Sequence, residues 1–328
     1  MRQRISSISL AAGLLGVLVA AAPVHLWGAE GSFDKTLQVT GPVDLQITTG
    51  SGAIQVRAGN SGTVQIHGRI KARDRGDGGL SAAEKVRQLE AHPPIEQDGN
   101  NIRVGHIEDS NLRQNVSISY EVVVPQETRL RAETGSGDQA VEGIKGPLKA
   151  ATGSGGIRVM RVGGEVHAET GSGDIQLDSI QGSVTANTGS GSIHANGVAG
   201  EFSGETGSGD VRLEQSAPGS VRVATGSGEV ELSGVRGPLK VETGSGGIKA
   251  QGELSGDWRL ETGSGGITVA LPSSAAFDLH AHTDSGRIST NRSITLQGTL
   301  SRNDYRGKVG AGGYLLEVKT GSGDIHIE

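Results

Sequence analysis

A short segment of the sequence carries alternating aspartates and histidines that could bind a metal ion. Asp278, His280, His282 and Asp284 lie two positions apart, so their side chains would share one face of a β-strand. Imidazole nitrogens and carboxylate oxygens are common zinc ligands. Against this, side chains two residues apart on a flat strand diverge, and no further ligand stands out elsewhere in the sequence. Two interpretations therefore stay open, a zinc site and ordinary solvated histidines.

A second candidate for cation binding is a series of aspartates at glycine-rich turns. Asp138, Asp174 and Asp210 each follow a Gly-Ser-Gly sequence. Calcium takes about six to eight oxygen ligands, and calcium-binding solenoids place an aspartate in such turns. However, every second turn lacks the acid, as at Gly156 and Ser192. Because alternation also separates like charges along a stack, it has an explanation without any bound ion.

The sequence offers little that predicts catalysis. The recurring serine of the Gly-Ser-Gly turns has no spaced His and Asp partners, and no turn continues into the Gly-Lys-Ser/Thr of a phosphate-binding loop. The chain contains no Cys, which excludes thiol nucleophiles, thiolate metal sites and disulfides. A polysaccharide-active enzyme is the main enzymatic alternative, but it needs paired acids and aromatic platforms. Trp258 is the only Trp in the repeats, and we expect it in the core, since Leu239 and Phe277 lie at the matching positions of adjacent repeats. We expect no enzyme and no cofactor.

The elements that position these residues are repeats. The tetrapeptide Thr-Gly-Ser-Gly begins at Thr49, Thr134, Thr152, Thr170, Thr188, Thr206, Thr225, Thr243, Thr262 and Thr320, with a Thr-Asp-Ser-Gly variant at Thr283. Between Thr134 and Thr262 the intervals are 18 or 19 residues. A fixed period of this kind is typical of a solenoid, in which each repeat contacts only its neighbours.

Each repeat reads as two short strands separated by turns. Apolar residues alternate with polar ones, as at Ile157 and Val159 and again at Val166 and Ala168, which predicts one buried face per strand. Gly makes up 55 of 328 residues and aromatic residues only 2%, which suits a narrow interior and turns that need positive φ. The predicted fold is an all-β, single-stranded parallel β-solenoid, right-handed, with about 18 residues per coil. Gln139 takes an apolar position, and we expect its coil either to be distorted or to lie at the join with the cap.

The repeat pattern sets the predicted boundaries. Residues 131–291 form the regular solenoid, residues 30–130 an N-terminal cap, and residues 292–328 an irregular insertion followed by a final capping coil. Within the N-terminal cap, Ser81-Ala82-Ala83-Glu84 is a capping box, which predicts one short helix ending before Pro93.

Residues 1–29 are predicted to be a signal peptide. Arg2 and Arg4 precede an apolar run from Ile5 to Ala22, followed by small residues. The run is long enough to remain as a membrane anchor if it is not cleaved. The protein is therefore expected in the periplasm, at the cell surface or secreted, with no other membrane contact. The net charge of −6 gives no electrostatic footprint for nucleic acid.

The repeats resemble those of a bacterial family of adhesin-like domains of unknown function. The resemblance rests on Thr-Gly-Ser-Gly-Asp-Ile turns, as at Asp174-Ile175 and Asp324-Ile325, on the strand ending in Val122-Val123-Val124-Pro125, and on the closing stretch from Gly307 to Lys319. It covers most of residues 33–328. It implies a β-solenoid fold, export and an envelope or surface role, and it transfers no catalytic residues.

These observations predict an exported, non-catalytic scaffold or binding module. It would contact an envelope or surface ligand, protein or glycan, through rows of polar side chains. The rows include Arg158, Gln176, Arg212, Glu231 and Lys249. A polysaccharide-active enzyme and a cation-dependent adhesive module are the alternatives that the sequence leaves open.

Overall fold

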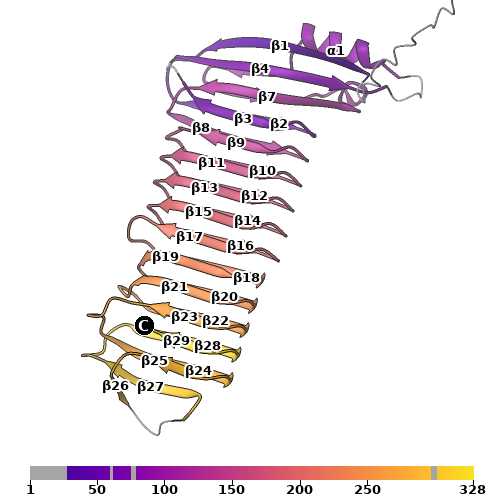
Figure 1. Cartoon of the computed structure of the whole chain (residues 1–328). Helices are drawn as coiled ribbons and strands as arrows, with labels where there is room; N and C mark the ends of the chain where they lie inside the picture. The colour runs from indigo at the N-terminus through magenta and orange to yellow at the C-terminus, as the bar shows by residue number, and fades with distance from the viewer. Residues whose placement is uncertain (1–27, 60–61, 75–78, 297–300) are drawn as a thin grey trace, which may run out of the picture.

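The computed structural model describes residues 28–59, 62–74, 79–296 and 301–328. The predicted signal peptide therefore lies outside the described residues, except for its last two positions. The described chain is mostly β and forms two long sheets of 14 and 15 strands, here called sheet A and sheet B. Figure 1 shows an elongated stack of coils with a cap at the N-terminal end. In the part of the chain described, no helix is long and apolar enough to cross a membrane.

Each coil of the stack contributes one strand to sheet A and one to sheet B. The repeat strands of sheet A are β9 (Gln139–Glu142), β11 (Ile157–Val162), β13 (Ile175–Ile180), β15 (Ile193–Val198), β17 (Val211–Gln215), β19 (Val230–Arg236), β21 (Ile248–Glu253) and β23 (Ile267–Ala270). Those of sheet B are β8 (Thr128–Thr134), β10 (Leu148–Thr152), β12 (Val166–Thr170), β14 (Val184–Thr188), β16 (Phe202–Thr206), β18 (Val221–Ser227), β20 (Leu239–Ser245) and β22 (Trp258–Ser264).

Equivalent residues of successive coils pair in parallel. Thr152 pairs with Thr170, and Ile157 pairs with Ile175, so the register joins residues 18 positions apart in this part of the stack. Where the interval from Thr206 to Thr225 becomes 19, the extra length lies in the turn between β17 and β18. Val198 pairs with Gln215, 17 positions later, and Phe202 pairs with Val221, 19 positions later. Strands β11, β13 and β15 alternate with period 2 over their first residues and then carry two outward residues before the last buried one, as Asn196 and Gly197 do before Val198.

The core is a thin layer of aliphatic side chains between the two sheets. One coil shows the pattern: its buried side chains include Ile157, Val159, Val166 and Ala168, and residues at the equivalent positions of the neighbouring coils are buried as well. Trp258 is fully buried, and its Nε1 donates a hydrogen bond to the Gly237 carbonyl at 3.0 Å. This agrees with its assignment to the core rather than to a sugar-stacking surface, since a buried indole N–H needs an acceptor.

The recurring threonine ties one coil to the next. The hydroxyl of Thr170 donates to the carbonyl of Gly155 in the preceding coil at 2.8 Å, and it accepts the N–H of Gly173 in its own turn at 3.1 Å. Thr188 and Thr206 repeat both contacts with their own glycines. These three threonines are buried, so each of their hydroxyls satisfies two backbone groups that would otherwise lack partners. The buried hydroxyl of Thr243, by contrast, has no hydrogen-bond partner among the described residues.

The second glycine of the tetrapeptide is required by close packing of the turns. A Cβ built on Gly173 would lie 1.9 Å from the carbonyl oxygen of Gly155, and one on Gly191 would lie 1.9 Å from that of Gly173. Neither glycine has positive φ. The expectation that positive φ explains the turn glycines is wrong at these positions; the turns stack backbone on backbone and leave no room for a side chain.

Gln139 does not distort its coil. It pairs in register between Ile54 and Ile157, and it is buried. Its Nε2 reaches across the core to the carbonyl of Ala151 at 2.5 Å, while its Oε1 is buried without a hydrogen-bond partner among the described residues. The expected distortion is absent because a glutamine has nearly the length needed to bridge the two sheets.

The N-terminal cap closes one end of the stack with antiparallel strands. It contains β1 (Ala29–Gln38), β4 (Thr63–Ala72), β5 (Ile95–Asp98), β6 (Asn101–Val104) and β7 (Val116–Val124), and it encloses a first coil made of β2 (Val43–Thr49) and β3 (Ile54–Ala58). Helix α1 (Ala82–Ala91) carries the predicted capping box and covers the outer strands of sheet A, as Figure 1 shows. A second short helix, α2 (Ser110–Arg113), was not expected; Asp109 caps it.

At the other end, the order of the coils departs from the order of the chain. This end contains β24 (Phe277–Ser285), β25 (Ile288–Thr290), β26 (Ile294–Leu296), β27 (Asp304–Val309), β28 (Leu315–Ser322) and β29 (Ile325–Ile327). Strand β28 lies between β22 and β24, and β29 lies between β23 and β25. Residues 315–327, here called the threaded coil, therefore sit inside the stack. The prediction that they form a final capping coil is wrong; β25, β26 and β27 lie at this end instead.

The stacked turns give a direct test of the close-packing argument. Gly191→Ala should lower the free energy of unfolding by about 2–4 kcal/mol, because the new methyl group forces two backbones apart in a tightly packed site. Ser190→Ala in the same turn is exposed and should change it by less than about 0.5 kcal/mol. Denaturant unfolding of both variants checks this, and equal stabilities would contradict it.

The buried glutamine gives a second test. Gln139→Ile should raise the free energy of unfolding by about 1 kcal/mol, since it removes a buried acceptor without a partner and continues the column of Ile54 and Ile157. The measurement is again denaturant unfolding. A loss of stability would mean that the hydrogen bond from Gln139 to Ala151 stabilises the fold by more than the burial of the unpaired Oε1 destabilises it.

Candidate functional site

The predicted zinc residues lie on β24, at the edge of the threaded coil. Phe277, Leu279 and Ala281 of this strand point into the core, so the intervening Asp278, His280 and His282 point outward. Strand β27 pairs antiparallel with one side of β24, and β28 pairs parallel with the other.

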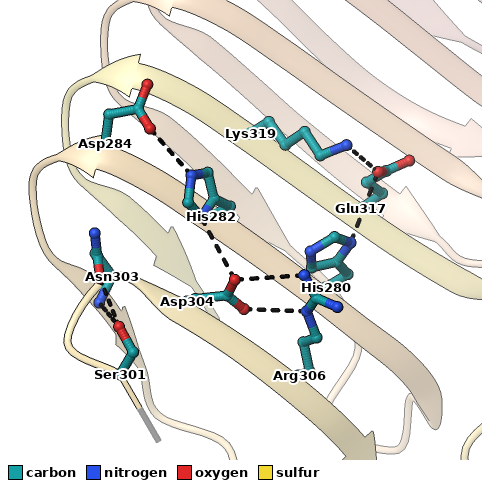
Figure 2. Close-up of polar contacts among 9 residues, drawn as sticks. All are labelled: His280, His282, Asp284, Ser301, Asn303, Asp304, Arg306, Glu317 and Lys319. Atoms are coloured by element: carbon teal, nitrogen blue, oxygen red, sulfur yellow. Dashed lines mark hydrogen bonds and ion pairs between the residues drawn. The ribbon is translucent and has the colours of Figure 1, made fainter.

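This pairing surrounds the two histidines with charged residues from both neighbours. His280 lies opposite Arg306 on β27 and Glu317 on β28. His282 lies opposite Asp304 and Lys319. Figure 2 shows these side chains converging on the two imidazoles. None of the four partners was predicted, because they come from a strand order that the repeat does not reveal.

Each histidine contacts carboxylates, but the contacts differ in length. His282 Nε2 lies 3.1 Å from Asp284 Oδ1, and its Nδ1 lies 3.6 Å from Asp304 Oδ2. His280 Nδ1 lies 3.7 Å from Glu317 Oε1. Arg306 Nε donates to Asp304 Oδ1 at 3.2 Å, so one carboxylate is shared between an imidazole and a guanidinium. Figure 2 draws this chain of contacts.

Glu317 is the buried centre of the cluster. Only 9% of its side chain is exposed, and Arg259 Nε donates to its Oε2 at 2.6 Å, while Lys319 binds its other oxygen. The hydrogen bond from Lys319 lowers the pKa of Glu317, and Arg259 adds to the effect against the opposing influence of burial. Burial lowers the pKa of His280, and the Arg306 cation lowers it further. At neutral pH the cluster therefore holds an ionised glutamate and a neutral histidine.

The described residues include no group of three or more His, Asp and Glu side chains placed to hold a metal ion. Asp278 stands apart from the histidines, with Lys308 Nζ at 4.0 Å from its Oδ1. Among the described residues, Asp284 forms a polar contact only with His282, and its side chain is 75% exposed. Two cations, Arg306 and Lys319, occupy the space around the imidazoles. The zinc site stays a prediction, and the contacts present here are those of a salt-bridge network.

The aspartates of the turns have a structural contact of their own. Asp138 Oδ1 accepts the backbone N–H of Gly156 at 2.9 Å, and Asp174 Oδ1 accepts that of Ser192 at 2.8 Å. Asp210 does the same with Glu229 at 2.9 Å. Each aspartate therefore binds the equivalent position of the next coil, which gives it a structural role without a bound ion. Cation binding by these residues stays a prediction.

The predicted polar row lies on the outer face of sheet A. We call Arg158, Gln176, His194, Arg212, Glu231 and Lys249 the polar ladder, since they occupy equivalent positions of successive coils. Its members contact one another: Arg158 Nη2 donates to Gln176 Oε1 at 2.7 Å, and Arg212 Nη1 lies 3.1 Å from His194 Nε2. A shallow groove of about 640 Å³ follows it from Arg158 to Glu231.

These features define the class of protein, a β-solenoid of two stacked sheets with an antiparallel cap and polar outer faces. The chain belongs to the Toastrack DUF4097 family, whose profile matches residues 164–328. The resemblance to an adhesin-like domain of unknown function is thereby confirmed. No curated protein matches the sequence.

Three crystal structures are similar over nearly their whole length. A "putative cell adhesion protein" from Clostridium sporogenes is 12% identical, with 91% of this chain and 99% of that chain covered and a TM-score of 0.20. A "putative lipid binding protein" from Parabacteroides distasonis is 14% identical, with coverages of 90% and 96% and a TM-score of 0.43. A "putative adhesin" from Bacteroides fragilis is 12% identical, with coverages of 93% and 100% and a TM-score of 0.32. The family assignment rests on the profile match.

The charged cluster predicts a pH-dependent stability. The pKa of Glu317 lies below its usual value of 4.5, and that of His280 below 6.5, so the unfolded chain binds more protons than the folded one. The free energy of unfolding should therefore fall as the pH drops below about 6.5, and again below about 4.5. Glu317→Gln should lower it by about 1–3 kcal/mol at pH 7 and flatten the lower step. Unfolding measured between pH 3 and 8 checks both effects.

Glu261→Gln is the matched control, because Glu261 lies opposite Lys319 on β22 but is exposed. It should leave the stability and its pH profile nearly unchanged. A similar loss in both variants would mean that surface charge, and not the buried cluster, sets the effect.

Proposed function

We propose that this protein is an exported, non-catalytic β-solenoid that acts as a scaffold or binding module at the cell surface or in the periplasm. We further infer that its coils wind in the right-handed sense with 18 or 19 residues each, as parallel crossovers strongly prefer. The ligand would be an envelope or surface component, protein or glycan. Binding would occur by extended contact along the stack rather than in an enclosed pocket.

The polar ladder is the observation that carries this proposal. Its side chains repeat at the spacing of neighbouring parallel strands, about 4.8 Å, on a face that the paired strands hold rigid. Contacts between Arg158 and Gln176, and between His194 and Arg212, restrain side chains that would otherwise lose rotamer freedom on binding. Donors and acceptors that are already ordered lower the entropic cost of association. A ligand with regularly spaced polar groups would meet several of them at once.

Family membership does not define the ligand, since the function of the Toastrack DUF4097 family is unknown. A rigid stack offers avidity as well as contact, because weak contacts along one ligand act together. The cluster around Glu317 would then serve stability at one end of the stack, leaving the ladder free for binding.

The experiment uses residues 30–328 as bait against envelope extracts and an array of bacterial glycans. A triple variant, Arg158→Ala with Gln176→Ala and Arg212→Ala, should weaken capture by about tenfold or more, as expected for the loss of charged hydrogen bonds. The matched control is Lys149→Ala with Thr185→Ala and Arg222→Ala, which removes the same charge from the outer face of sheet B.

Equal capture by the two triple variants would contradict the proposal that the polar ladder is the binding surface. Turnover of a glycan by the purified protein would instead indicate a polysaccharide-active enzyme. Capture that needs calcium and is abolished by EDTA would indicate a cation-dependent adhesive module.

A further inference from the structure

A cavity of about 490 Å³ lies in the N-terminal cap, far along the stack from the polar cluster of β24. Its walls come from the end of β2, from β5, from β6 and the residues after it, and from α2 and the start of β7. The apolar part of its lining includes Val104, Ile107, Val116 and Ile118. A volume of this size is within the usual range for sites that bind small molecules.

Tyr120 presents a buried hydroxyl at this cavity. Its ring occupies the core column next to Ile54, with 1% of the residue exposed, and the residue lines the cavity. The hydroxyl has no hydrogen-bond partner within the described part of the chain. Burial raises the pKa of Tyr120 far above its usual value of 10, so the hydroxyl stays protonated and can act as a donor. A buried hydroxyl without an acceptor is unfavourable, and a ligand that supplies one removes that cost.

Gly105 lies against this hydroxyl without a side chain between them. It follows β6, has φ +90 and also lines the cavity. A Cβ at this position would lie 3.2 Å from the hydroxyl oxygen of Tyr120 and 1.8 Å from the carbonyl oxygen of Thr48. A side chain here would therefore clash with the backbone of β2 and crowd the hydroxyl.

The charged lining favours an anion. Arg103 and Arg113 both line the cavity, whereas Glu96 is the one acid among the described residues of its lining. Arg103 is held only loosely by Glu96, at 4.0 Å, and both side chains are exposed. Arg113, at the end of α2, forms no ion pair with any described residue. The positive charge at the cavity is thus in excess and only partly neutralised by the protein.

We propose that this cavity binds a small amphiphilic carboxylate. The carboxylate accepts a hydrogen bond from the Tyr120 hydroxyl and pairs with Arg113, and with Arg103 once that side chain leaves Glu96. The apolar chain of the ligand packs against Ile107, Val116 and Ile118. The site is separate from the polar ladder and does not depend on the proposed extended binding.

The test is calorimetric titration of residues 30–328 with decanoate below its micelle concentration, beside 1-decanol and acetate. Decanoate should bind, and both other compounds should bind much more weakly. 1-Decanol lacks the carboxylate that the proposal places at Tyr120 and Arg113, and acetate lacks the apolar chain. Tyr120→Phe should weaken decanoate binding about fivefold, and Arg113→Gln about tenfold, as expected for a neutral and a charged hydrogen bond.

Tyr305→Phe and Arg222→Gln are the matched controls, since both residues lie away from the cavity. Tyr120→Phe should unfold at the same temperature as the unchanged protein or slightly above it, because it removes a hydroxyl that has no partner. No binding of decanoate, equal binding of decanol, or an unchanged affinity in a folded Tyr120→Phe protein would each overturn the proposal.

Discussion

A hydrogen bond from a threonine hydroxyl to a glycine carbonyl of the preceding coil holds the turns of this protein in contact. The same hydroxyl accepts an N–H of its own turn, so one side chain organises both the turn and its stacking. This contact brings backbones so close that only glycine fits at the last position of the Thr-Gly-Ser-Gly turn. The abundance of glycine and the scarcity of aromatic residues follow, because tightly stacked coils enclose only a thin aliphatic core.

Much of this architecture could be predicted because the information is local and repeated. The spacing of the threonines gave the period, and alternation at residues such as Ile157 and Val159 gave the buried faces. The capping box at Ser81 placed α1. Trp258 was assigned to the core because its register neighbours are apolar, and it is indeed buried. Each of these inferences needs only neighbouring residues in the chain or the equivalent residues of neighbouring coils.

The order of the coils could not be predicted in the same way. Leu316, Val318 and Thr320 carry the same pattern as every other strand of sheet B, so the sequence does not say which strands they pair with. The cluster around His280 depends on that pairing, which is why Asp304 and Glu317 were missed. The hydrogen bond of Asp138 to the next coil could not be predicted either, since the N–H that it accepts belongs to the backbone and does not depend on the residue type at position 156.

The threaded coil determines the order in which this end of the stack is assembled. Strands β24 and β25 precede β28 and β29 in the chain, yet they reach the rest of the stack only through them. During synthesis, residues 277–290 therefore emerge without their parallel partner strands and stay incompletely paired until residues 315–327 have been made. A folding step that waits for later residues is non-local and slow compared with the coil-by-coil growth open to the preceding repeats.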